Sequence, residues 1–273
     1  MLFLYSHHIT DLYCVLDDLL PPPAAHTGRP SALSQSEVLT ILVWNTLVLN
    51  QKTLKGVYEN MKRYHGGDFP SLPSYQAFVE GCHRSLPNAH ALLSSLLKDE
   101  AVVRIMDSTM LPVCKLARAD DHKVAKDMAR FGKNWQGWHY GFKLHASIDL
   151  EGNLSGIFFS PANMYDAQAM PKILNEHCKL AVGDTLYGAS VMGRRIRKEY
   201  GTVIIAPPFP KQNKKIAVGW ELKLLDVRSK IEAVFDYLKE HLHLVSSFPR
   251  SIAGYFVHYI SVLLGYQVMR GVS

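Results

Sequence analysis

Three acidic residues have the types and the spacing that metal-dependent phosphodiester chemistry requires. Asp107 and Asp184 each end a short apolar run, and Glu232 lies in a long amphipathic segment. Such chemistry needs two or three carboxylates around a pair of divalent ions, which stabilise the attacking and leaving oxygens. Magnesium prefers oxygen ligands, so Asp and Glu suffice and neither His nor Cys is needed.

The two aspartates also have a simpler interpretation. An Asp that follows a strand is often only a turn former or a helix cap. If the runs 104–107 and 180–184 are adjacent strands, however, their ends meet at one edge of a sheet, where ligands characteristically gather. Taken without a third group, Asp107 and Asp184 leave both interpretations open.

The segment 222–244 supplies that third group on a predicted helix. Apolar residues recur there at helical spacing and form a core-facing stripe: Val227, Ile231, Val234, Phe235, Leu238 and Leu242. Arg228, Glu232 and Lys239 are separated by four and seven positions, so they share a neighbouring stripe. A carboxylate between two cations suits a metal-bound phosphate, whereas a row of surface ion pairs is the alternative.

These residues need a scaffold, and the pattern of the chain changes near residue 98. Residues 1–98 read as short helices, with a capping box at Ser34–Glu37 and helix-capping residues at Ser74 and Asn88. This suits either a helix-turn-helix-like DNA-binding module or a plain helical bundle. Residues 99–273 alternate apolar runs, a Glu-Gly-Asn hairpin turn and helical segments, an order typical of a mixed-sheet α/β domain.

The stretch 101–270 resembles the catalytic domain of DDE-type bacterial insertion-sequence transposases. The resemblance rests on MDS, on GDTLYG, and on the spacing R-x3-E-x6-K from Arg228. The family's tyrosine position falls on Leu225 and Thr185-Leu186 replace its usual Lys-Gly, which puts the roles of those family side chains in doubt, while Asp184 and Tyr187 of the motif remain. The segments Gly-Arg-Pro-Ser, YGFKLH and SPANMYDAQ are similar to the nine-eighty-two group of insertion sequences.

The resemblance implies a ribonuclease-H-like sheet flanked by helices. It makes Asp107, Asp184 and Glu232 the catalytic residues and the ligands of two Mg²⁺ ions, with Mn²⁺ as a possible substitute. The implied reaction is cleavage at transposon ends followed by strand transfer. The implied partners are transposon-end DNA with its terminal inverted repeats, target DNA, and a second copy in a homodimer. Two alternatives remain, a catalytically idle DNA-binding relative and a ribonuclease-H-like nuclease without strand transfer.

Several cations are candidates for phosphate contacts, which supply most non-specific affinity for DNA. They are Arg228, Lys239, Lys143, Arg194 and Arg195. Lys143 and His145 alternate on one predicted strand and therefore share a face. For Lys143, the alternative is a surface lysine on a half-exposed strand. For Arg194 and Arg195, the alternative is a solvated helix face.

Two further motifs receive structural interpretations. Asp166 is expected to cap the helix that follows it rather than to compete as a metal ligand. Trp135 and Trp138 lie in the basic, aromatic segment KDMARFGKNWQGWHYG. Packing against the sheet is the simpler role for these tryptophans, and stacking on unpaired bases is the alternative.

Composition adds broad limits. Lys and Arg outnumber Asp and Glu by 30 to 24, a modest excess that favours an anionic partner. The four cysteines contain no Cys-x-x-Cys pair, as expected of reduced thiols. The apolar runs 38–49 and 252–268 are interpreted as buried core helices, and the first residues lack the pattern of a signal peptide. We therefore expect a cytoplasmic, nucleoid-associated protein with no membrane segment.

Overall fold

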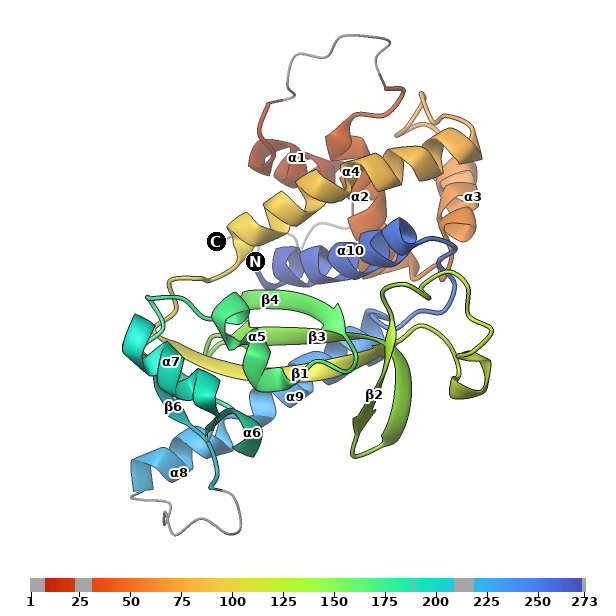
Figure 1. Cartoon of the computed structure of the whole chain (residues 1–273). Coiled ribbons are helices and arrows are strands. Elements are labelled where there is room, and N and C mark those ends of the chain that lie inside the picture. The colour runs from red at the N-terminus through yellow and green to blue at the C-terminus, as the bar shows by residue number, and fades with distance from the viewer. Residues whose placement is uncertain (1–7, 23–30, 189, 209–218, 272–273) are drawn as a thin grey trace. The chain divides into compact units, whose positions relative to one another are not determined.

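The computed structural model describes residues 8–22, 31–188, 190–208 and 219–271 (Figure 1). The chain forms two compact units, one of residues 1–96 and 240–273, the other of residues 97–239. Gly28, Arg29 and Pro30, which belong to the family-like Gly-Arg-Pro-Ser segment, lie outside the described residues.

The first unit is helical. Its elements are α1 (Ile9–Leu19), α2 (Gln35–Trp44) with the π-helical turn η2 (Asn45–Leu49), α3 (Leu54–Tyr64), α4 (Tyr75–Leu96) and α10 (Ile252–Gly271). The predicted capping box of α2 is present, because Ser34 Oγ accepts from the Glu37 amide and the Ser34 amide donates to Glu37 Oε2. Asn88 caps no helix, since α4 runs on through Pro87 as one element.

The helix α10 belongs to the first unit, whereas the predicted division at residue 98 grouped it with residues 99–273. It packs instead against α4 and α2, and Gln267 Nε2 donates to the Leu96 carbonyl. The reason is that α10 is apolar on nearly all sides and needs partners around it. By length and composition alone it could cross a membrane, but 72% of its apolar window is buried, as in a core helix.

The second unit contains a mixed six-stranded sheet. Its strands are β1 (Val103–Pro112), β2 (Arg130–Asn134), β3 (Gly137–Ile148), β4 (Leu154–Pro161), β5 (Leu180–Val182) and β6 (Val203–Ile205). The order is β2-β3-β1-β5-β6, and β4 also pairs with β3. Pairs along β3 are antiparallel, whereas β1, β5 and β6 run parallel. The predicted fold, a ribonuclease-H-like mixed sheet flanked by helices after a helical region, is confirmed. The strand β2 was not predicted.

Helices flank both faces of this sheet (Figure 1). They are α5 (Asp166–Ile173), α6 (Thr185–Gly188), α7 (Val191–Tyr200), α8 (Gly219–Asp226) and α9 (Ser229–Asp236), followed by the π-helical turn η4 (Tyr237–His241). Met106 packs into a core with residues of α5 and α7, while α9 packs against β1. Because side chains alternate along a strand, Met106 and Ser108 face α5 and Asp107 faces the opposite way.

Candidate active site

Asp107 lies in the middle of β1, which runs on to Pro112 instead of ending at this aspartate as predicted, whereas Asp184 follows the end of β5, the adjacent parallel strand. Ile105 of β1 pairs with Val182 of β5, and each aspartate comes two residues after its member of the pair. This pairing brings the two carboxylates within electrostatic reach of each other, because the charge of Asp184 contributes to raising the pKa of Asp107. The predicted adjacency of the two strands is therefore present.

The electrostatics of the two aspartates reflect a crowded acidic site. Burial raises the pKa of Asp107 to about 6, and the negative charge of Asp184 adds to this effect, opposed by a hydrogen bond from the Ser108 amide. Burial also raises the pKa of Asp184, with a contribution from Asp166. Arg228 acts in the other direction and lowers the pKa of both aspartates. The negative charges of these carboxylates would also stabilise a further positive charge bound beside them.

Glu232 projects from α9, the helix packed on β1, but its carboxylate is engaged elsewhere. Arg228 Nη2 lies 2.8 Å from Glu232 Oε1, and the Glu232 side chain is 51% exposed. Among the residues that the structure describes, no three His, Cys, Asp or Glu side chains are grouped closely enough to hold a metal ion as they stand. The structure thus brings Asp107 and Asp184 together and links Glu232 to them through Arg228.

The predicted single helix over 222–244 is interrupted twice. A turn separates α8 from α9 at Val227–Arg228, and the π-helical turn η4 begins at Tyr237. A π-helical turn closes i→i+5 hydrogen bonds and holds more residues than an α-helical turn. Arg228 and Glu232 do share a face, since they form an ion pair, whereas Lys239 lies in the π-helical turn, outside the α-helical spacing on which its place in their stripe was predicted. Lys239 lies within electrostatic reach of His139, whose pKa is lowered by burial and then by this lysine.

A buried polar network lies on the opposite face, around Asp166. Its Oδ1 accepts from Ser108 Oγ at 2.7 Å and from Lys143 Nζ at 2.9 Å, and His145 Nδ1 is 3.6 Å away. Ser108 in turn donates its amide to Asp107 Oδ1 at 2.8 Å. The expectation that Asp166 caps α5 is wrong, because Tyr165 is the N-cap residue and Asp166 begins the helix.

The same network changes the expected role of Lys143. Its side chain is buried and its ammonium also donates to the Met164 carbonyl at 2.9 Å. With Asp166 and this carbonyl as partners, Lys143 is directed inward rather than toward a phosphate. Sequence reasoning did place Lys143 and His145 on one face. It missed Asp166 because the contact to Ser108 spans 58 positions.

Tyr187 of the GDTLYG motif is a structural residue of the site. Its ring is fully buried, and its hydroxyl has no hydrogen-bond partner among the described residues. Burial raises its pKa, with contributions from Asp166, Asp107 and Asp184. A Cβ at Gly183 would come 2.7 Å from Tyr187 Cδ2, which explains why glycine precedes Asp184 in this motif.

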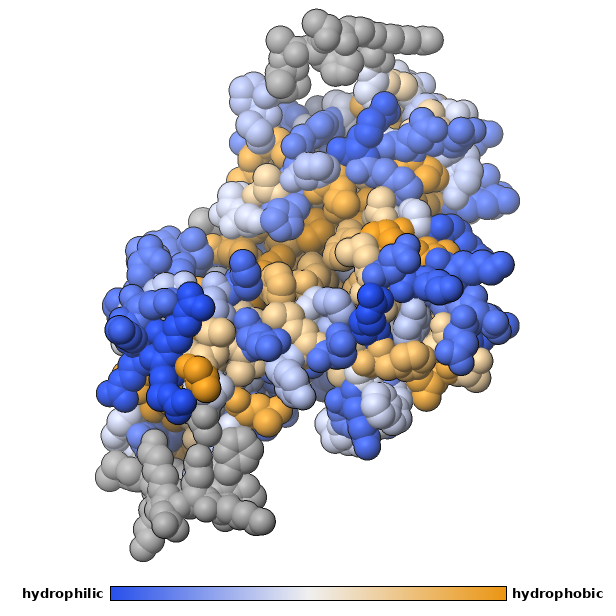
Figure 2. Space-filling model, viewed as in Figure 1, coloured by the Kyte–Doolittle hydropathy of each residue, from blue (hydrophilic) through white to orange (hydrophobic). Residues whose placement is uncertain are grey.

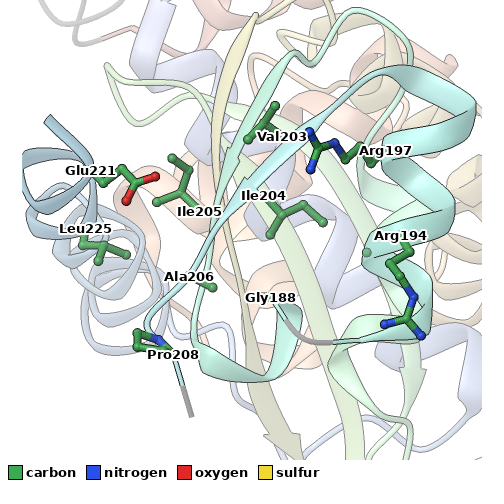
Figure 3. A pocket seen from close by; sticks show the side chains of 11 residues that line it. Gly188, Arg194, Arg197, Val203, Ile204, Ile205, Ala206, Pro208, Glu221 and Leu225 are labelled. Atoms are coloured by element: carbon green, nitrogen blue, oxygen red, sulfur yellow. The ribbon is translucent and has the colours of Figure 1, made fainter. Parts of the chain in front are cut away.

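A cationic surface lies over α7, where hydrophilic side chains gather (Figure 2). Arg194 and Arg197 line a hollow of about 210 Å³, with β6 as its floor and Glu221 and Leu225 of α8 opposite (Figure 3). Among the described residues neither of these arginines forms an ion pair. Arg195 instead pairs with Glu199 at 2.7 Å.

The donor set of the site fits a divalent cation. Asp107 and Asp184 offer carboxylate oxygens within electrostatic reach of each other, and burial, together with neighbouring carboxylates, raises the pKa of both. Arg228 supplies positive charge and holds the third carboxylate, Glu232, on the neighbouring helix.

The comparisons with known proteins agree with this geometry. A family profile described as a transposase DDE domain matches residues 98–252, more than half of the chain. No curated protein and no solved structure matches the chain. The matched range contains the whole second unit apart from its first residue, and includes the strands that carry Asp107 and Asp184. The chain belongs to the DDE transposases, enzymes that act on DNA and generally use divalent metal ions.

Proposed function

We propose that this transposase cleaves DNA at transposon ends and joins the released ends to target DNA, with Asp107, Asp184 and Glu232 as its catalytic residues. The parallel pairing of β1 with β5 supports this proposal, because Asp107 and Asp184 follow the paired residues and the charge of Asp184 acts on Asp107. The packing of α9 on β1 supports the third role, since it places Glu232 on an element that borders the same strand.

The two aspartates and Glu232 are proposed to hold two Mg²⁺ ions, with Mn²⁺ as a substitute. When bound, such ions stabilise the attacking and leaving oxygens of a phosphodiester. The chain's own residues orient the site. Ser108 holds Asp107 through its amide, and Asp166 holds the Ser108 hydroxyl from behind. Arg228 balances the carboxylates and would contact a phosphate oxygen once Glu232 leaves it.

The order of reactions follows from the need for an aligned nucleophile. Water would attack the phosphate at the element end and release a 3′-hydroxyl, which would then attack target DNA. The second step depends on proximity, because the hydroxyl must be held in line with the target phosphate. We propose that a homodimer pairs two transposon ends for this step.

The DNA surface is proposed to include Arg228, Lys239, Arg194 and Arg195. Between Arg194 and Arg195 of α7, Arg194 is the stronger candidate, because it lines the hollow beside β6 while Arg195 is paired with Glu199. The helical residues 1–98 are proposed to recognise the terminal inverted repeats. YGFKLH and SPANMYDAQ support membership of the nine-eighty-two group, and DNA as substrate supports a cytoplasmic, nucleoid-associated location.

One experiment tests this function. The protein is incubated with Mg²⁺, its own element ends and a target plasmid, and the cuts and joints are mapped. Cleavage with joining supports the transposase reaction. Cleavage without joining would mean a nuclease of the same fold, and binding without either would mean an idle relative. Asp107→Asn serves as the control that should abolish both products.

A further inference from the structure

The hairpin formed by β2 and β3 exposes two tryptophans. Trp135 is 91% exposed and Trp138 is 55% exposed, although both are large apolar side chains. The expectation that they pack against the sheet is wrong. An exposed pair of this size at one tip needs a partner, because most exposed apolar side chains occur singly.

The hairpin tip is a built structure. Trp135 and Gln136 form a two-residue loop between Asn134 and Gly137, whose backbone has a φ of +119°. Asn134 Oδ1 accepts from the Gln136 amide at 2.9 Å and is 2.9 Å from His139 Nε2. These contacts of the Asn134 side chain hold the loop in place. Trp135 is therefore presented outward by an ordered turn.

Trp138 is presented with a cation over its ring. Lys133 is its cross-strand partner, and Lys133 Nζ lies 5.8 Å from the Trp138 ring centroid. Further down the same pair of strands, Phe131 packs on Tyr140 with ring centroids 4.9 Å apart. The hairpin thus combines aromatic surface with positive charge. Between Asp127 and Asp149 the sequence has no acidic residue.

The hairpin is continuous with the strand that borders the candidate active site. The strand β3 that carries Trp138 also pairs with β1, where Ala146 lies opposite Asp107. His139, next to Trp138, lies within electrostatic reach of Lys239 beyond α9. The β-strand that pairs with the strand of Asp107 therefore also carries a cationic, aromatic surface, along which bound DNA could extend from the aspartates.

We propose that Trp135 and Trp138 form a stacking platform for unpaired bases of DNA that also contacts the candidate active site further along β3. The inference rests on the proposed function in that DNA is the partner. Every base has an apolar π-face that stacks on an aromatic ring, and its phosphate pairs with a nearby cation such as Lys133. A second copy of this hairpin is a poorer occupant, because it would bring a like-charged surface against the first.

Intrinsic fluorescence in EDTA tests the platform without catalysis. The chain has four tryptophans, and Trp220 of α8 is 53% exposed away from the hairpin, which makes it a matched control. In a Trp220→Phe background, single-stranded oligothymidylate should quench the emission of Trp135 and Trp138. Replacing both with Ala should weaken oligothymidylate binding by roughly 10-fold or more, whereas Trp220→Ala stays within about twofold of the parent.

Replacing both with Phe should restore much of the affinity, because phenyl rings also stack, and equal melting temperatures confirm that the variants are folded. Unchanged affinity in the double Ala variant, or no quenching in the Trp220→Phe background, would overturn the platform. So would loss of dimerisation in the double Ala variant with unchanged DNA binding, which would make the tip a contact between copies. This binding is measured without metal, whereas cleavage is measured with Mg²⁺ and the Asp107→Asn control. Failure of the platform and failure of the proposed cleavage are therefore seen in different assays.

Discussion

Arg228 Nη2 lies 2.8 Å from Glu232 Oε1, one helical turn away along α9. The same guanidinium lowers the pKa of Asp107 and Asp184, so a single cation serves three carboxylates. A divalent ion between the aspartates would repel Arg228 and weaken its hold on Glu232. We thus expect the ion pair between Arg228 and Glu232 to form in the metal-free site and to weaken when a divalent ion binds.

Glu232→Gln should abolish cleavage and leave binding to element ends largely intact. The amide keeps the shape of the side chain but loses the charge that holds a metal ion. Since Glu232 is half exposed, loss of its ion pair should change the free energy of unfolding by only about 0–1 kcal/mol. End cleavage, end binding and thermal unfolding are measured on the same preparation.

Glu199→Gln is the matched control for this change. Glu199 also forms an exposed ion pair with an arginine four positions away, Arg195, but it lies on α7. Cleavage should survive in this control. If Glu232→Gln cleaves within about threefold of the parent, Glu232 is only an ion-pair residue and the assignment of the third carboxylate fails.

Asp107→Asn should stabilise the fold near neutral pH while abolishing cleavage. The pKa of Asp107 is raised from 3.8 to about 6, so the folded state binds the proton more tightly than the unfolded state. This contribution is fully present below about pH 4 and is lost as the pH rises through 6. At pH 7 the buried charge costs up to about 3 kcal/mol, which the neutral amide removes.

Thermal unfolding from pH 4 to pH 8 without metal measures this effect. The melting temperature of Asp107→Asn should exceed that of the parent at pH 7, and the difference should shrink toward pH 4. Asp236→Asn, an exposed change at the end of α9, should show no such difference. A parent-like pH profile for Asp107→Asn would mean that Asp107 is not strained by burial and by Asp184.

Divalent-ion binding should strengthen as the pH rises through about 6. A carboxylate must lose its proton before it binds a metal ion, and Asp107 does so only in that range. Isothermal titration of Mg²⁺ at pH 5 and pH 8 measures the difference. Equal affinity at the two values would place the bound ion away from Asp107.

The two strands of this site could be predicted from sequence because their signals are local, although β1 continues past Asp107 to Pro112. An apolar run that ends in Asp appears twice, and the hairpin turn between β3 and β4 shows how the chain returns. The parallel pairing of these strands then brings Asp107 and Asp184 within electrostatic reach of each other. By contrast, the network around Asp166 depends on contacts to Ser108 and Lys143 across 58 and 23 positions, which no local pattern contains.

The helix after β6 shows a second limit of sequence patterns. Ile231, Val234, Phe235 and Leu238 have ordinary α-helical spacing, and this spacing hides the π-helical turn at Tyr237. The hairpin of β2 was missed because its turn, Asn-Trp-Gln-Gly, separates the turn-forming Asn134 and Gly137 by two residues. Tryptophan is also usually buried, so the exposure of Trp135 follows only from its place at a hairpin tip.

Lys143→Met should destabilise the second unit and should not act primarily on DNA affinity. The side chains of Lys143 and Asp166 are 9% and 15% exposed, and their atoms are 2.9 Å apart. Removing one member of a buried pair leaves the other charge uncompensated, at a typical cost of about 3–5 kcal/mol. Lys143→Met combined with Asp166→Asn should recover part of this loss. Weakened DNA binding with unchanged unfolding would instead return Lys143 to the set of phosphate contacts.

Arg194→Ala should weaken binding to element ends more than Arg195→Ala, although the two residues are neighbours on α7. Arg194 lines the hollow beside β6 with no ion-pair partner among the described residues, whereas Arg195 holds Glu199 at 2.7 Å. A cation on a phosphate releases a counterion, so its loss should flatten the dependence of log affinity on log salt by about 0.9. Both variants should unfold as the parent does, because exposed charges contribute only about 0–1 kcal/mol. Binding curves at several salt concentrations compare the two slopes directly. Equal slopes for Arg194→Ala and the parent would show that DNA does not reach this hollow, and that α7 presents only a solvated cationic face.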